Sequence, residues 1–340
     1  MKKSVIIAGG GLAGLSLGIA LRLRGVNVCI HEASVYPRHR VCGEFISGVS
    51  DTVLSRLGIM EALRDAPRLT TACWNESSSA TPLLSNIKVS GRAISRWTLD
   101  ETLRGQFESL GGILSTCSRI TPSEGTIWAT GRVRHPDAAL HWIGLKCHAK
   151  NLPLTHDLEM TIGTEGYIGL ARLGDGTVNV CGLFRIRRSL TSKGSELLLE
   201  YLRLGGFHPL ARRIGEAILD EKSFCGTSGF GFGEPSPPSS DFPIGDAARM
   251  IPPFTGNGMS MAFESADCAL QPVLDYAEGT SSWSEACLEN SRIQKRRFRK
   301  RLAVASLIQP LLMSRSGLFL LRTLSGTKTL PYGILLNLLR

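Results

Sequence analysis

The stretch SVIIAGGGLAGLSLGIALRLRGVNVCIHEA, residues 4–33, changes its periodicity twice. Residues 5–8 form a short apolar run, which is typical of a buried parallel strand. Residues 12–24 carry apolar side chains at helical spacing, and Gly25 provides a helix-ending position. Residues 26–31 form a second apolar run that ends at Glu32. The stretch therefore predicts a strand, a helix and a second parallel strand.

The glycines between the first strand and the helix fit the pattern GxGxxG. Gly9 permits the tight turn, Gly11 lets the backbone approach a pyrophosphate, and Gly14 lets helix and strand pack closely. The backbone N–H groups of the first helical turn, which contains Leu12 and Ala13, point toward the phosphates. The sequence therefore predicts a dinucleotide site at this turn.

The acidic residue at the end of the second strand supports the same site. Glu32 lies 23 residues after Gly9 and is followed by Ala33. An acid about 20 residues after the glycines accepts a hydrogen bond from a ribose hydroxyl. An acid rather than a basic residue here favours a free ribose over a 2′-phosphate. The motif alone does not separate FAD from NAD.

Two later segments bear on that choice. GRAISRWTLDETLRGQF, residues 91–107, predicts a strand followed by a helix that begins at Thr98 or Asp100. FPIGDAARMIPPFTGNGMSMAFESADCAL, residues 242–270, predicts a short strand, a loop rich in proline and glycine, and a helix from about Gly258.

Together the three segments resemble the FAD-dependent monooxygenase and geranylgeranyl-reductase superfamily, which has the para-hydroxybenzoate-hydroxylase-like fold. The resemblance implies that Gly245 and Asp246 bind the ribityl chain and pyrophosphate of FAD. It also implies that Arg96, in the segment RWTLDETL, lies near the cofactor. WATGR, residues 128–132, resembles a third FAD contact that includes Gly131, although Thr130 stands where the acid usually does.

The loop and helix after Asp246 carry the remaining cofactor residues that the resemblance implies. They lie against the isoalloxazine ring and include Pro253, Gly256, Asn257, Gly258 and Met259. A helix that starts there directs N–H groups and partial positive charge at the flavin. This charge stabilises negative charge on the reduced ring and raises its potential.

The loop YPRHRVCGEF, residues 36–45, offers the candidate catalytic residues. Arg38 and Arg40 can pair with phosphate or ribose oxygens, and Gly43 lets the backbone pass close to the ring. Cys42 either packs against the isoalloxazine, acts as a proton donor or redox-active thiol, or is an unrelated buried thiol. Glu44 either exchanges protons with the substrate or caps a helix. The geranylgeranyl-reductase-like relatives carry a similar Arg/Lys-x-Cys-Gly segment.

We therefore predict an α/β protein with an FAD-binding, Rossmann-like domain of the glutathione-reductase type. An antiparallel β-sheet substrate domain is inserted into it, and a helical segment ends the chain. The expected boundaries are 1–65, 92–135 and 240–280 for the FAD domain, 66–91 and 136–239 for the β-sheet layer, and 281–340 for the C-terminal helices.

The inserted sheet is expected to line the substrate pocket with one face. Its segments alternate apolar and polar residues, and Gly174-Asp175-Gly176 predicts a hairpin turn. The candidate pocket residues are Trp142, Leu145, Met160, Tyr167 and Leu183.

Only one dinucleotide fingerprint is present, so the sequence shows no resident NAD(P)H domain. NAD(P)H or a reduced electron-transfer protein would then reduce FAD transiently. The preferred function is hydride transfer from reduced flavin to a hydrophobic small molecule. The alternatives are an FAD-dependent monooxygenase that uses oxygen and NAD(P)H, and a flavoprotein that modifies a side chain of a partner protein.

No metal site is predicted. The nine cysteines contain no CxxC pair, which is the spacing of most zinc sites. The histidines have no recognisable spacing; they are His31, His39, His135, His141, His148, His156 and His208.

The formal net charge of +10 is uneven, because RIQKRRFRKR, residues 292–301, holds seven basic residues. Aromatic interleaving is limited to Phe298, so no nucleic-acid partner is expected. The apolar stretches after this run predict amphipathic helices that either cover the core or rest on a membrane surface. With no secretory signal and no spanning segment, we expect a cytoplasmic protein that either stays in solution or associates with a membrane surface.

Overall fold

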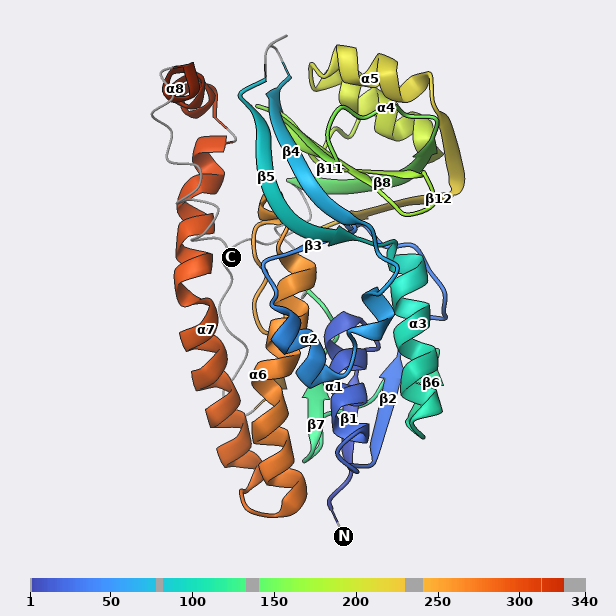
Figure 1. The fold of residues 1–340 in the computed structure, drawn as a ribbon, viewed down its shortest axis with the longest axis vertical. Coiled ribbons are helices and arrows are strands. Elements are labelled where there is room, and N and C mark those ends of the chain that lie inside the picture. Colours follow the sequence, from blue (N-terminus) through green and yellow to red (C-terminus); the bar gives the residue numbers. More distant parts are fainter. Residues whose placement is uncertain (1, 78–81, 133–140, 230–240, 313, 327–340) are drawn as a thin grey trace.

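Two β-sheets, one above the other in Figure 1, organise the molecule. The computed structural model describes residues 2–77, 82–132, 141–229, 241–312 and 314–326. The lower half contains a parallel sheet with helices against it, and the upper half contains a larger mixed sheet (Figure 1). The expected mixture of a parallel sheet, helices and a second sheet is confirmed, whereas the domain boundaries stay predictions.

The parallel sheet has five strands in the order β13-β7-β1-β2-β6, and every neighbouring pair is parallel. Its strands are β1 (Val5–Ala8), β2 (Val28–Glu32), β6 (Ile113–Thr116), β7 (Thr126–Trp128) and β13 (Phe242–Pro243). The order strand, helix, strand predicted for residues 4–33 is typical of such a parallel sheet.

Three helices enclose this sheet: α1 (Leu12–Arg22), α3 (Arg96–Ser109) and α6 (Gly258–Glu278). All residues of α1 from 12 to 21 are buried, because α3 and α6 both pack against it. The predicted start of α6 at Gly258 is confirmed. The predicted start of α3 was too late, because Ser95 caps the helix by accepting a hydrogen bond from the Trp97 N–H at 3.1 Å.

The glycines of the first turn differ in the space around them. Gly9 has φ +110°, and a Cβ there would lie 2.3 Å from the Ala129 carbonyl oxygen. A Cβ on Gly14 would lie 2.0 Å from the Gly9 carbonyl oxygen. Gly11 has no atom within 4 Å of the corresponding position. Two of the three glycines therefore allow close packing, and the third leaves open space above the helix N-terminus.

The mixed sheet has eight strands in the order β12-β8-β11-β10-β9-β4-β5-β3. They are β3 (Phe45–Ser47), β4 (Arg68–Glu76), β5 (Leu84–Ala93), β8 (Trp142–Lys150), β9 (Leu158–Gly163), β10 (Gly166–Arg172), β11 (Val178–Arg185) and β12 (Ile218–Ser228). The chain reverses between β10 and β11 around Gly174-Asp175-Gly176, as predicted. Only the β4–β9 pair among these neighbours is parallel.

One face of the mixed sheet packs against helices α4 (Gly194–Leu204) and α5 (His208–Gly215). Leu145, Cys147 and Ala149 of β8 belong to this core. Leu145 was expected to line the pocket, and this expectation was wrong. Side chains alternate along a strand, so Leu145 points to the helices while Lys146 and His148 point to the opposite face.

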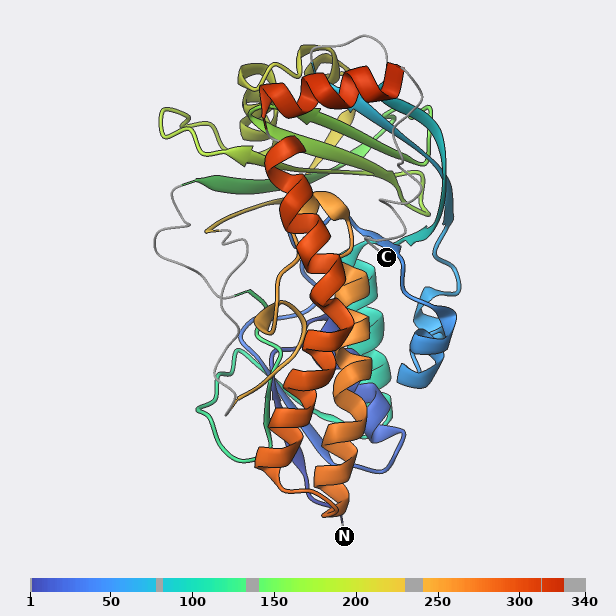
Figure 2. The same ribbon diagram turned by 90° about the vertical axis from the view of Figure 1, so that its left-hand side faces the viewer.

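The remaining helices lie at the edges of the two halves. They are α2 (Asp51–Leu57), α7 (Trp283–Leu312) and α8 (Arg315–Gly326), with short 3₁₀ turns at η1 (Glu61–Leu63), η3 (Gly245–Ala247) and η4 (Pro253–Thr255). α7 runs beside α6, and α8 crosses its upper end (Figures 1 and 2). The carboxylate of Glu264 in α6 pairs with Arg297 and Arg301 of α7. None of the helices in the described ranges combines the length and apolar character needed to cross a bilayer.

The crowding at Gly14 predicts a large effect of one methyl group. Gly14→Ala should lower the free energy of unfolding by about 1–3 kcal/mol, because the new Cβ forces the helix away from β1. In ligand-free protein, the open position of Gly11 makes Gly11→Ala the matched control, with a change of less than about 1 kcal/mol. Denaturant unfolding followed by circular dichroism measures both. Equal stability of the two variants would contradict the close packing.

Candidate functional site

The carboxyl ends of four neighbouring parallel strands bring distant sequence segments together. Gly9 follows β1, and its backbone lies against Ala129 and Thr130, which follow β7. Gly245 follows β13, and a Cβ on it would lie 3.0 Å from the Cβ of Ala13 in α1. Glu32 ends β2. Ligands of open parallel sheets bind at this edge, so the predicted cofactor residues meet where the fold expects a ligand.

Open space surrounds several of these positions. No atom lies within 4 Å of an ideal Cβ on Gly11, Gly131 or Gly258. The N-terminus of α1 has no side-chain cap, and neither does that of α6. Helix starts without a side-chain cap, beside glycines that leave room, fit the phosphates of a dinucleotide.

The Asp246 carboxylate is exposed to solvent although it lies deep among protein atoms. Desolvation raises the pKa of Asp246 to about 6, while Arg96 and Arg132 act in the opposite direction. Because the side chain still contacts solvent, water offsets part of this rise. An accessible carboxylate at this edge of the sheet is suited to accept a hydrogen bond from a ligand hydroxyl.

Two carboxylates position the three arginines beside this edge. Glu32 Oε1 accepts from Arg38 Nη2 at 2.9 Å, and Asp100 Oδ2 accepts from Arg40 Nε at 3.0 Å. Arg96 binds Asp100 with two hydrogen bonds, of 2.7 and 2.8 Å. Paired carboxylates hold the guanidinium groups in fixed orientations.

Glu32 also binds the glycine turn, since its Oε2 accepts from the Gly10 N–H at 2.9 Å. The Tyr36 hydroxyl donates to the Gly10 carbonyl from the other side. Tyr36 was not among the predicted site residues. Its contact depends on the path of the loop after β2, which no local pattern encodes. Ala33 is exposed beside this turn.

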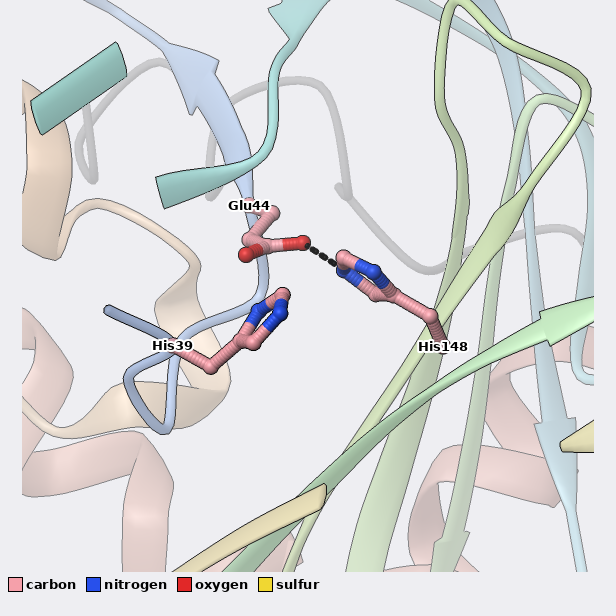
Figure 3. Close-up of side chains that lie close together, drawn as sticks. All are labelled: His39, Glu44 and His148. Atoms are coloured by element: carbon pink, nitrogen blue, oxygen red, sulfur yellow. Dashed lines mark hydrogen bonds and ion pairs between the residues drawn. The ribbon is translucent and has the colours of Figure 1, made fainter. Parts of the chain in front are cut away.

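Glu44 is fully buried and bridges both halves of the molecule. Its Oε2 accepts from His148 Nε2 at 2.6 Å (Figure 3). Its Oε1 accepts from the Arg96 N–H at 2.9 Å, and Lys146 Nζ lies 3.5 Å from Oε1. Burial raises the pKa of Glu44, but the His148 hydrogen bond and the Lys146 charge outweigh it and lower the pKa below its usual value. These contacts at the start of α3 favour the helix-capping role over proton transfer.

His39 completes the same cluster. Its ring stacks on Trp97 with the centroids 4.6 Å apart, and its Nδ1 lies 3.0 Å from Lys146 Nζ. Burial and the Lys146 charge lower the pKa of His39 to about 4. His39 is therefore neutral near pH 7 and accepts a hydrogen bond from Lys146. His39, Glu44 and His148 are close enough to share a metal ion (Figure 3), but the Lys146 ammonium already supplies the positive charge between them.

Cys42 lies in a part-buried loop between α3 and the mixed sheet. Burial raises the pKa of the Cys42 thiol, although Arg96 opposes this. Its sulfur accepts from the Glu44 N–H at 3.4 Å, and its carbonyl accepts from Asn179 Nδ2 at 2.9 Å. Gly43 continues this loop. The thiol is therefore protonated at neutral pH, which agrees with packing or proton donation and not with a standing thiolate.

An apolar cavity of about 60 Å³ lies where the mixed sheet meets the η4 loop. Its lining includes Phe45, Trp74, Met160, Phe254 and Asn257. Met160, one of the expected pocket residues, lines this cavity. Of the other expected pocket residues, Tyr167 and Leu183 pack in the cluster that contains Phe254, with Trp142 at its edge.

The predicted flavin-facing loop borders this cavity. Ser47 Oγ donates to Asn257 Oδ1 at 3.3 Å, and a Cβ on Gly256 would lie 2.0 Å from Phe45 Cζ. Pro253 begins the η4 turn. Met259 differs from its neighbours, because it is buried in the core of the parallel-sheet half. The contact of these residues with a cofactor stays a prediction.

Neither the family models nor the curated proteins contain a match to this chain. Solved structures do match it. A geranylgeranyl bacteriochlorophyll reductase-like protein from Thermoplasma acidophilum has a TM-score of 0.74 and 19% identity, over 96% of this chain and 91% of the other. The flavin-dependent brominase Bmp2 has a TM-score of 0.77 and 17% identity, over 99% and 92%.

A third match is the p-nitrophenol 4-monooxygenase PnpA from Pseudomonas putida DLL-E4. Its TM-score is 0.75 at 12% identity, over 99% of this chain and 96% of that one. This chain shares the fold of these enzymes. The resemblance expected from the three sequence segments is therefore confirmed at the level of the fold. Identities this low do not carry the reaction from one protein to another.

The half-buried, neutral His39 predicts a pH-dependent stability. Its folded pKa of about 4 lies below the ordinary 6.5, so from pH 6.5 down to about 4 the unfolded chain binds a proton that folded His39 does not. Wild-type stability should therefore fall over this window by about 1 kcal/mol more than that of His39→Gln, after allowance for solvent screening. Urea unfolding at several pH values measures it.

The exposed His208 supplies the control for this comparison. His208→Gln should keep the wild-type pH dependence. If His39→Gln and wild type lost the same stability between pH 6.5 and 4, the lowered pKa of His39 would be disproved.

The raised pKa of the Cys42 thiol predicts slow alkylation. Iodoacetamide at pH 7.5 should modify the exposed Cys117 at least about tenfold faster than Cys42, because only a thiolate attacks and only an accessible one is reached. Peptide mass spectrometry at timed intervals measures both rates. Labelling of Cys42 as fast as Cys117 would indicate an activated thiol instead.

Proposed function

We propose that this chain is an FAD-dependent oxidoreductase that acts on a hydrophobic small molecule, with hydride transfer from reduced flavin as the reaction. One observation carries the proposal. The open glycine positions and the accessible Asp246 lie at the carboxyl edge of the parallel sheet, and the η4 loop joins that edge to the apolar cavity. The shared fold with flavin-dependent enzymes supports it.

Under this proposal, different residues of the chain would bind the pyrophosphate, the ribityl chain and the ring of FAD. The turn at Gly11 and the N-terminus of α1 would hold the pyrophosphate, with Arg38 and Arg40 nearby. Asp246 would accept a hydrogen bond from a ribityl hydroxyl, and the N-terminus of α6 after Gly258 would face the ring. When bound, FAD would supply the two-electron chemistry that these side chains lack.

The lining of the cavity supports the proposed class of substrate. Phe45, Trp74, Met160 and Phe254 offer apolar surface, which excludes water and favours an apolar molecule. The sequence carries one dinucleotide fingerprint, so the electron donor would be NAD(P)H or a reduced protein that binds transiently.

A monooxygenase is the second candidate function. The monooxygenase PnpA matches this fold with a TM-score of 0.75 and the reductase-like protein with 0.74, so overall similarity does not favour either reaction. The two differ in their need for oxygen, and that difference decides between them.

The absorption spectrum of the purified protein tests the proposal. We expect flavin bands, or their appearance on reconstitution with FAD, and bleaching when NADPH or NADH is added. With an apolar acceptor such as a prenylated quinone or alkene, a reductase turns over without air, whereas a monooxygenase stops. A protein that stays colourless after reconstitution would overturn both candidates.

Two substitutions test whether FAD binds at the proposed site, with FAD binding measured from the flavin spectrum. Gly11→Ala should fold normally yet weaken FAD binding at least about tenfold, since its methyl group fills the space left for phosphate. Asp246→Ala should also weaken binding, by about 1–2 kcal/mol for the loss of one charge-assisted hydrogen bond. Ile113→Ala, at an exposed position of β6, should bind FAD as the wild type does.

A further inference from the structure

The outer side of α7 and α8 exposes four large apolar side chains. Leu307 is 74% exposed, Leu311 48%, Phe319 71% and Leu320 48%. Their neighbours Leu312 and Leu318 point inward and are almost fully buried, so the exposed residues are not part of the core. Both helices lie at the same side of the molecule, the side that faces the viewer in Figure 2. We call these four residues the apolar tip.

Basic residues lie on the same face of α7, about two to three helical turns before Leu307. At about 100° per residue, Arg296, Arg299 and Lys300 project within roughly 120° of Leu307 and Leu311. All three basic residues are exposed. Two other cations of the run, Arg297 and Arg301, instead pair with Glu264 of α6. The run thus divides into a part that fixes α7 to the protein and a part that points to solvent.

We propose that this face of α7 and α8 docks on an anionic lipid bilayer. The apolar tip would enter the boundary between head groups and acyl chains, and the exposed cations would contact the anionic head groups. A second copy of the chain fits less well, because a symmetric contact would bring these cations against one another. The formal net charge of +10 adds to the attraction toward a negative surface.

The inner sides of α7 and α8 pack near the apolar cavity, so docking would bring the cavity close to the bilayer. Leu312 and Leu318 pack in one cluster with Met160 and Phe254, both of which line the apolar cavity. One layer of helix therefore separates the cavity from the docking face. A substrate dissolved in the bilayer would lie close to the cavity. The docking itself does not depend on the proposed function.

Vesicle flotation tests the proposal on the full chain. Vesicles of phosphatidylcholine with phosphatidylglycerol should carry the protein upward at low salt, and vesicles of phosphatidylcholine alone should carry much less. Higher salt should release it. Arg296→Gln/Arg299→Gln/Lys300→Gln should weaken partitioning on the order of 100-fold, at about fivefold per charge. Leu307→Gln/Leu311→Gln should also reduce it at least about tenfold.

Matched substitutions elsewhere on the surface serve as controls. Leu204→Gln/Ile218→Gln removes exposed apolar groups, and Lys150→Gln/Arg212→Gln/Lys222→Gln removes exposed charges. Both should float like the wild type, with unchanged circular dichroism in all variants. The proposal fails if the wild type does not float with anionic vesicles, or if the substituted tip floats equally well. It also fails if light scattering shows a dimer that Leu307→Gln/Leu311→Gln converts to a monomer.

Discussion

A single buried carboxylate links the two halves of this molecule. Glu44 has no exposed surface, and it meets the start of α3 on one side and Lys146 and His148 of β8 on the other. Removing one partner from a buried charge costs roughly 3–5 kcal/mol, which is a large part of the stability of an ordinary domain. The loop that carries Cys42 and the arginines is therefore fixed between the sheets. The geometry of the candidate site depends on this contact.

The beginning of the fold could be predicted because its signals are local. Strand, glycine turn, helix and strand follow one another within residues 4–33, and Gly14 packs against the Gly9 carbonyl of the same stretch. Contacts between distant residues were harder to predict. Lys146 and His148 looked like polar positions of an alternating strand, and nothing near them in sequence indicated Glu44 or His39. They could have been suspected only because a lysine and a histidine stood on the same side of an otherwise apolar strand.

Two smaller differences have simple physical causes. Leu145 was placed on the pocket side because alternation gives the period of a strand but not which face is covered by helices. The helix α3 begins at Arg96 because the hydroxyl of Ser95 satisfies a free N–H group, a signal that was present in the sequence. The positions of the cofactor residues agree with the edge where parallel strands end. Their roles depend on a ligand that the sequence only implies.

The order of strands in the parallel sheet has a consequence for synthesis of the chain. Its edge strand β13 comes from residues 242–243, and the helix α6 that covers α1 starts only at Gly258. The first helix, apolar on every side, emerges long before the partners that bury it. Until then it presents apolar surface to the ribosome exit region and to chaperones. The residues that start the parallel sheet are thus synthesised first, and those that complete it, in β13 and α6, are synthesised last. The strands of the mixed sheet are synthesised between them.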